Sequence, residues 1–115
     1  MVSDTANLIW HKLIELHRWE QAHFPGAGSS GASEVLTWLL RTLDTPRPVS
    51  ELYRSLTTSQ PTLRRCLREF TDAGLATVVR DPRDTRRRVV RPTPQLRVLV
   101  DDYRQVLRRL MAESP

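Results

Sequence analysis

Residues 78–90 constrain the fold of this 115-residue chain more than any other stretch. Their sequence, VVRDPRDTRRRVV, places five arginines and two aspartates between two pairs of valines. Valine favours strands, and Asp81 followed by Pro82 suits the first two positions of a type I turn. The stretch therefore predicts a β-hairpin with legs at residues 75–80 and 87–91 and a charged loop of about six residues.

Two short helices are predicted just before this hairpin. Residues 48–56 have one apolar face and a proline suited to a first helical turn, and residues 57–60 follow as a polar turn. Ser59 is expected to cap the second helix, and Gly74 to end it. The apolar positions of that helix recur at i, i+3, i+4 and i+7: Leu63, Cys66, Leu67 and Phe70. Its arginines fall on the opposite face: Arg64, Arg65 and Arg68. This pattern predicts a helix-turn-helix.

Long amphipathic helices are expected at both ends, over residues 4–23 and 94–113, and an apolar core helix is expected from Ser33 to residue 43. We expect a mainly α fold with a small β-hairpin in one domain, residues 1–115. Its parts are an N-terminal dimerisation helix (1–24), a winged helix-turn-helix core (33–92) and a C-terminal dimerisation helix (94–113). Two long terminal helices exceed what a core of roughly 60 residues needs, which favours a homodimer. Packing of these helices onto the chain's own core is the alternative.

Positive charge is concentrated in the middle of the chain. Residues 46–97 hold twelve arginines and five acidic residues, a net charge of +7, whereas residues 1–45 sum to −2. Such a block predicts a polyanionic partner, with nucleic acid first and an anionic membrane surface second. No apolar run is long enough to span a membrane and no signal-peptide pattern is visible, so we expect a soluble cytoplasmic protein.

Other kinds of site find little support. No Ser/His/Asp arrangement, carboxylate pair or nucleotide loop is present, so we expect no catalytic residues, no cofactor and no enzyme. The stretch FPGAGSSGAS, residues 24–33, holds three of the four glycines, and its GAG lacks the rest of a phosphate-loop motif, so the stretch predicts a flexible connector that ends the first helix. His11, His17 and His23 recur every six residues, which does not bring successive imidazoles to one helix face for a metal. Cys66 is expected to be a buried thiol, with a redox switch as the alternative.

Residues 35–94 resemble the winged-helix domain of the multiple-antibiotic-resistance regulator (MarR) family of bacterial transcription factors. The resemblance is carried by PVSELYRSL, SQPTLRRCLREFTDAGL and RDPRDTRR, of which the last is close to the family's wing signature. It implies a sequence-specific, dimeric transcriptional regulator with its recognition helix in the major groove and its arginine wing in the minor groove. It also implies a palindromic double-stranded operator and small aromatic ligands bound between the dimer and DNA-binding regions.

The resemblance also assigns roles to individual residues. Thr62, Arg64 and Arg65 fall where the family's recognition helix meets DNA, Asp84 where an acid braces the wing, and Arg86 where an arginine enters the minor groove. The full set expected to contact DNA is Ser59, Gln60, Thr62, Arg64, Arg65, Arg68, Arg83, Arg86 and Arg87.

The remaining arginines and the tryptophans have simpler interpretations. Three arginines alternate along the strands and are expected to be solvated or paired with Glu69, Asp81 or Asp102: Arg80, Arg88 and Arg91. Trp10, Trp19 and Trp38 are expected in the core rather than around an aromatic ligand.

Two other functions stay open at this point. Winged helices also act as docking modules, so the arginine hairpin could meet an acidic protein partner. RNA binding is less favoured because the chain has only two tyrosines and two phenylalanines, none near the hairpin.

Overall fold

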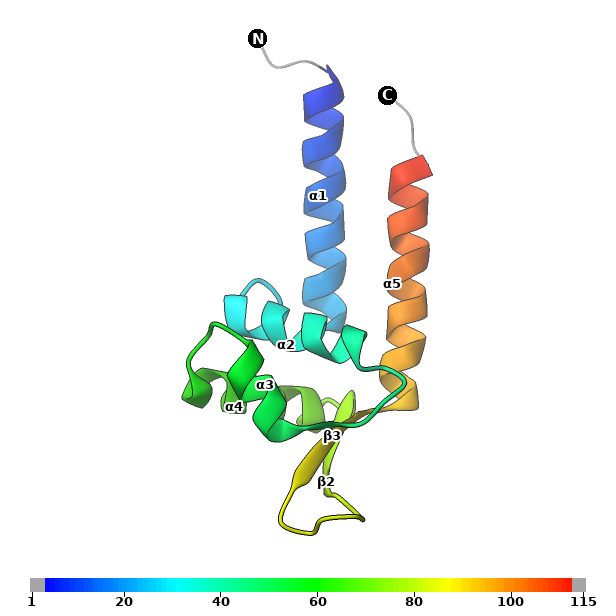
Figure 1. The fold of residues 1–115 in the computed structure, drawn as a ribbon. Helices are drawn as coiled ribbons and strands as arrows, with labels where there is room; N and C mark the ends of the chain where they lie inside the picture. Colours follow the sequence, from blue (N-terminus) through cyan, green and yellow to red (C-terminus); the bar gives the residue numbers. More distant parts are fainter. Residues whose placement is uncertain (1–3, 113–115) are drawn as a thin grey trace.

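The computed structural model describes residues 4–112 and is mainly helical. Its elements are α1 (Asp4–His23), α2 (Ser30–Arg41), β1 (Arg47–Pro48), α3 (Val49–Ser55), α4 (Gln60–Asp72), β2 (Ala76–Arg80), β3 (Arg88–Pro92) and α5 (Pro94–Ala112). Helices α1 and α5 stand side by side and project from the part that holds the other elements (Figure 1). The two outer ends of the predicted terminal helices, residues 1–3 and residue 113, lie outside the described residues.

The predicted hairpin is formed by β2 and β3. These strands pair antiparallel, with Val78 opposite Val90 and Arg80 opposite Arg88. A third strand, β1, was not predicted: Arg47 and Pro48 pair with the outer side of β3, which makes the sheet order β1-β3-β2. A two-residue edge strand that contains proline has no alternating pattern from which it could be recognised.

Helix α2 begins three residues earlier than predicted, at Ser30 instead of Ser33. Ser29 has an extended backbone, and its hydroxyl accepts a hydrogen bond from the Ala32 N–H at 3.2 Å. Gly31 is buried within the helix, where a Cβ atom would lie 3.1 Å from the Cys66 Sγ. One of the glycines that indicated a flexible connector therefore allows α2 to approach α4 closely.

The core is enclosed by α2, α3, α4, the sheet and the first half of α5. The apolar face of α4 is buried as predicted: Leu63, Cys66, Leu67 and Phe70. Burial of each such large apolar side chain contributes about 1.5–3 kcal/mol relative to exposure. Gly74 follows α4 with a φ of 77°, a backbone conformation that favours glycine, and it ends the helix as predicted.

Helices α1 and α5 contact each other through an aromatic cluster near the core. The Trp19 ring stacks on Tyr103, with centroids 5.3 Å apart, and on His23 at 4.0 Å. The Tyr103 hydroxyl donates to Glu20 Oε2 at 2.8 Å, and burial together with this bond raises the pKa of Tyr103 to about 12. The lower halves of the two helices are thus fixed to one another and to the core.

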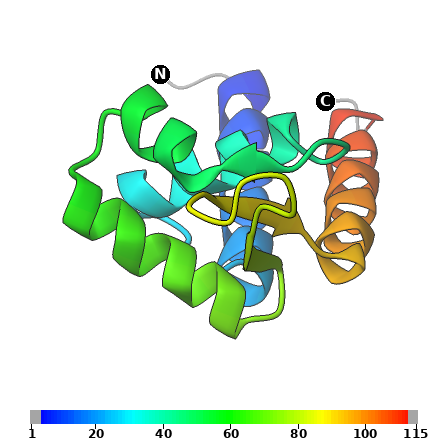
Figure 2. The same cartoon turned by 60° about the horizontal axis from the view of Figure 1, so that its bottom comes forward.

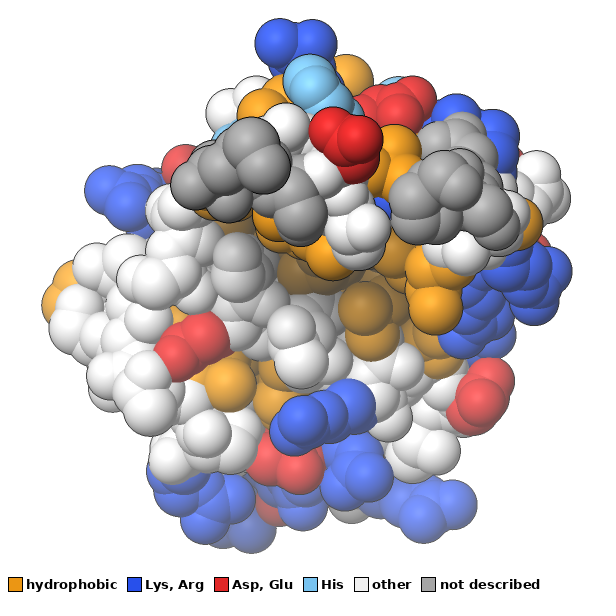
Figure 3. Space-filling view, turned by 90° about the horizontal axis from the view of Figure 1, so that it is seen from above, with side chains coloured by type: hydrophobic (Ala, Val, Ile, Leu, Met, Phe, Trp, Pro, Cys, Tyr) orange, Lys and Arg blue, Asp and Glu red, His pale blue; other side chains and the backbone are white. Residues whose placement is uncertain are grey.

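The outer halves of the same helices expose apolar side chains. No residue of α1 is buried, and Trp10 is 65% exposed, contrary to its expected place in the core. Seen from above, hydrophobic side chains gather around the outer ends of the two helices (Figure 3). The large exposed ones on these two helices are Ile9, Trp10, Leu13, Ile14, Val98 and Met111. Between residues 4 and 112, no helix is long and apolar enough to cross a membrane.

Candidate nucleic-acid interface

The predicted helix-turn-helix is formed by α3, α4 and the turn between them. Viewed with the bottom of the molecule forward, α3, α4 and the β2–β3 hairpin lie on one side, with α1 behind them and α5 at the right (Figure 2). The second helix of the helix-turn-helix and the hairpin therefore belong to the same side of the fold.

A carboxylate from α2 holds the turn between α3 and α4. Glu34 accepts hydrogen bonds from the Thr57 N–H at 3.3 Å, the Thr58 N–H at 3.1 Å and the Thr57 hydroxyl. These bonds, that of the Thr57 side chain first, lower the pKa of Glu34 below its ordinary value. Sequence reasoning missed this residue, because nothing in the local pattern links an acid to a turn 23 positions further along the chain.

The start of α4 differs from the sequence prediction. Ser59 occupies the N-cap position, but its side chain makes no capping bond to the backbone. Its hydroxyl instead donates to Thr62 Oγ1 at 3.1 Å. Thr62 is half-buried, with its methyl group next to Gly31 of α2, whereas Gln60 is exposed. Of these three predicted contact residues, Gln60 is the freest to reach a ligand.

The three arginines of α4 are exposed as predicted, but they divide between two flanks of the helix. Arg65 Nε lies 3.8 Å from Glu69 Oε1, and Glu69 lies close to Gly26 in the α1–α2 loop. Arg64 and Arg68 instead line the groove between α4 and the sheet. The Arg64 guanidinium lies 5.9 Å from the centre of the Tyr53 ring, within the range of a cation–π contact.

The groove beside α4 has a volume of about 340 Å³. It is lined by residues of α3, α4, β2 and β3: Val49, Tyr53, Arg64, Leu67, Arg68, Thr71, Val78 and Arg88. Arg88 was expected to be solvated or paired with an acid. It forms no ion pair with a carboxylate among residues 4–112, and neither do Arg64 and Arg68.

The hairpin loop contains the predicted turn. The Asp84 N–H donates to the Asp81 carbonyl at 3.3 Å, and the Arg83 N–H donates to Asp81 Oδ1 at 2.9 Å. Asp84 Oδ1 accepts from both the backbone N–H and the Nε of Arg86, at 3.1 and 3.2 Å. The Arg86 side chain is 91% exposed at the tip. Asp84 thus contacts both the backbone and the guanidinium of this exposed side chain.

Two more arginines shape this loop. Arg87 Nε lies 4.0 Å from Asp81 Oδ2, and Arg80 Nη1 donates to the Thr85 carbonyl at 3.2 Å. Arg80, expected to be solvated or paired with an acid, is exposed and bonds to this loop carbonyl. Arg83 and Arg91 are exposed, and both line a separate groove on the other side of the sheet.

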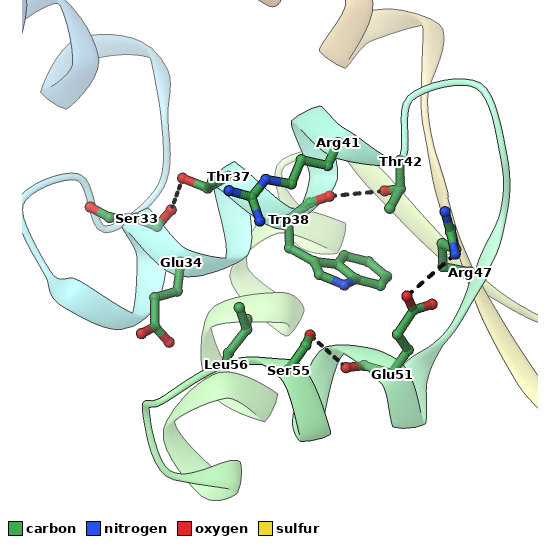
Figure 4. Close-up of a pocket in the computed structure, with 10 residues that line it drawn as sticks. All are labelled: Ser33, Glu34, Thr37, Trp38, Arg41, Thr42, Arg47, Glu51, Ser55 and Leu56. Atoms are coloured by element: carbon green, nitrogen blue, oxygen red, sulfur yellow. Dashed lines mark hydrogen bonds and ion pairs between the residues drawn. The ribbon is translucent and has the colours of Figure 1, made fainter.

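A further pocket, of about 420 Å³, lies between α2 and α3 (Figure 4). Trp38 occupies its centre and is only 6% exposed, so this tryptophan belongs to the core as predicted. The Glu34 carboxylate points away from the Trp38 ring, and Arg47 and Glu51 pair at 3.4 Å across the rim (Figure 4). Within residues 4–112, no group of three or more His, Cys, Asp or Glu side chains gathers in a way that could hold a metal ion.

Comparison with known proteins gives matches among solved structures alone. No family model and no curated protein matches the chain. MepR of S. aureus, solved in complex with DNA, is 17% identical with a TM-score of 0.77, over 96% of this chain and 87% of that one. MarR is 16% identical with a TM-score of 0.61, over 95% and 79%.

BpsR of Bordetella bronchiseptica, whose DNA binding is regulated by 6-hydroxynicotinic acid, is 19% identical with a TM-score of 0.56, over 98% and 84%. At these identities the likeness concerns the fold. The chain has the winged-helix fold of the MarR-family transcriptional regulators.

Proposed function

We propose that this protein is a sequence-specific, dimeric, DNA-binding transcriptional regulator. The observation that carries the proposal is the position of α4 and the β2–β3 wing on one side of the fold, with Arg64, Arg68 and Arg88 lining the groove between them, in a fold shared with a regulator solved on DNA. Helix α4 enters the major groove, which accepts an α-helix, and the wing lies over the flanking minor groove.

The groove contacts follow from the chemistry of arginine. A guanidinium can donate two parallel hydrogen bonds to a guanine edge, and Arg65 of the recognition helix is the residue that we assign to this contact. A narrow minor groove has a strongly negative potential that attracts an inserted arginine. Arg86, oriented by Asp84 through its backbone N–H and its Nε, is the wing side chain that we assign to that role.

The dimer forms through the exposed apolar side chains in the outer halves of α1 and α5, an interface that does not include Val98 in the inner half of α5. A twofold dimer presents two recognition helices, so the operator is a palindrome with half-sites about one helical turn apart. A small aromatic ligand is a further expectation, supported by the regulation of BpsR by 6-hydroxynicotinic acid. Thermal-shift screening with small aromatic acids tests it, because a bound ligand raises the melting temperature.

Titration with duplex DNA tests the function itself. We expect the protein to bind random duplex DNA at low salt, to lose this binding steeply as salt rises, and to retain a selected operator at physiological salt. Failure to bind any duplex at low salt would favour the alternative of docking to an acidic protein. Equal affinity for random and selected sequences would contradict the sequence-specific part of the proposal.

A further inference from the structure

The groove between α4 and the sheet gathers three arginines that have no acidic partner within the described residues, 4–112. Arg64 and Arg68 are one helical turn apart on α4, and Arg88 begins β3. Alternate residues of a strand share a face, so Arg88 lies on the same face as Val90, which is fully buried in the core next to Val78. The strand therefore turns Arg88 toward α4.

The walls of this groove suit an oxyanion. Tyr53 lies beside the Arg64 guanidinium, and the floor includes the buried side chains of Val49 and Leu67. Apolar walls exclude water once a ligand covers the groove, which strengthens the attraction between a guanidinium and an anion. By contrast, Arg65 on the other flank of α4 already has Glu69 as a partner.

We propose that Arg64, Arg68 and Arg88 form a seat for one phosphodiester group of the DNA backbone, at the point where a strand passes between the recognition helix and the wing. This assignment rests on the proposed function. It adds three arginines that position the protein on the backbone of any duplex, whatever its sequence. Guanidinium groups hold phosphate oxygens with paired, charge-assisted hydrogen bonds. A phosphate contact carries no sequence information, in contrast to a base contact.

The test compares Arg88→Gln with Arg91→Gln. Both changes remove one positive charge from exposed positions of the same strand, but Arg91 lies on the opposite face of the sheet, away from the seat. We expect Arg88→Gln to weaken binding to the operator and to random duplex by the same factor, roughly tenfold, and to make the salt dependence of binding shallower. Arg91→Gln is expected to change neither. A loss confined to the operator, or equal effects of the two variants, would overturn the seat.

A double variant tests whether the arginines share one phosphate. If Arg68 and Arg88 hold the same group, the combined change costs less affinity than the product of the two single losses. A fully multiplicative loss would show that they contact separate phosphates, and the single seat would be wrong. If the unmodified protein binds no duplex DNA at low salt, the proposed function is wrong as well. If the unmodified protein binds DNA and Arg88→Gln binds it equally well, the seat alone is wrong.

Discussion

The arginines of the wing tip differ in how they are held. Arg80 donates to a loop carbonyl and Arg87 pairs with Asp81, with its side chain 52% exposed, whereas the Arg86 side chain pairs with Asp84 through Nε and is 91% exposed. A side chain that a neighbouring carboxylate already orients, while it stays exposed, loses less conformational entropy when it inserts into a groove than a fully mobile one. This difference within one loop is why we single out Arg86 among the wing arginines.

Replacing Arg86 by alanine should therefore weaken operator binding by about 1–3 kcal/mol, through the lost minor-groove contact. Fluorescence anisotropy with a labelled operator measures the effect. Arg41→Ala is the matched control, because it removes the same charge from an exposed position on α2, outside the wing and outside the outer halves of α1 and α5. An Arg86→Ala protein that binds as tightly as the control would remove the wing tip from the mechanism.

Glu34 gives the turn of the helix-turn-helix a dependence on pH. Hydrogen bonds from Thr57 and Thr58 lower its pKa in the folded state below the ordinary value of 4.5. A group with a lowered folded-state pKa contributes stability above its unfolded pKa. The contribution is lost as the pH falls through the folded value.

We expect Glu34→Gln to have a lower free energy of unfolding than the unmodified protein at neutral pH. The difference should shrink as the pH falls below 4.5 and vanish at lower pH, where Glu34 itself is protonated. Urea unfolding at a series of pH values measures it, and Thr57→Val should reduce the difference by removing one partner of the carboxylate. A difference that stays constant through the acid range would contradict this account.

At the scale of the elements, α2 and α4 approach each other closely at Gly31. A Cβ atom there would lie 3.1 Å from Cys66 Sγ and 3.2 Å from the Thr62 methyl group. A larger side chain must push α4 away from α2, and with it the recognition face.

Gly31→Leu should lower the free energy of unfolding by about 1–3 kcal/mol through overpacking. It should also weaken operator binding by the protein that remains folded, because the recognition helix is displaced. Ser33→Leu, at an exposed position of the same helix, is the control for the added apolar side chain. Chemical denaturation and operator titration of both variants provide the measurement. Equal stability of the two variants would show that α4 can move to accommodate the new side chain without loss.

The sequence predicted the elements better than their junctions. The periodicity of α4 identified its buried face, because four apolar positions at helical spacing allow one orientation only. By contrast, β1 and the early start of α2 depend on pairing with β3 and on contact with Cys66, and such contacts leave no local pattern.

The candidate site shows the same division between local pattern and tertiary contact. The arginine face of α4 and the Asp81 turn could be predicted from the chain itself. The brace from Glu34 depends on the approach of α2 to a turn far along the sequence, so only the fold reveals it. Arg88 stands between these cases, since strand alternation from Val90 would have placed it on the α4 side of the sheet.

At the scale of the whole molecule, a single chain does not bury the apolar side chains on the outer halves of α1 and α5. Their exposed apolar side chains include Trp10 and Leu13, at 65% and 50% exposure, one helical turn apart on α1. Contiguous apolar surface of this kind marks interaction sites in soluble proteins. In a twofold dimer the same patch contributes from both subunits, so one substitution acts twice.

Trp10→Glu should therefore convert a dimer into a monomer, because it places a charge from each subunit into an apolar interface. Sedimentation equilibrium measures the mass, and far-ultraviolet circular dichroism checks that the helices persist. Val98→Glu, on an exposed position of α5 nearer the DNA-binding part, is the matched control and should stay dimeric. The monomer should bind a single half-site as before but lose the extra affinity for a palindrome, which comes from engaging both half-sites at once. If the unmodified chain sediments as a monomer at the concentrations at which it binds DNA, the dimer and the palindromic operator are both wrong, whereas the wing and the recognition helix stand on their own tests.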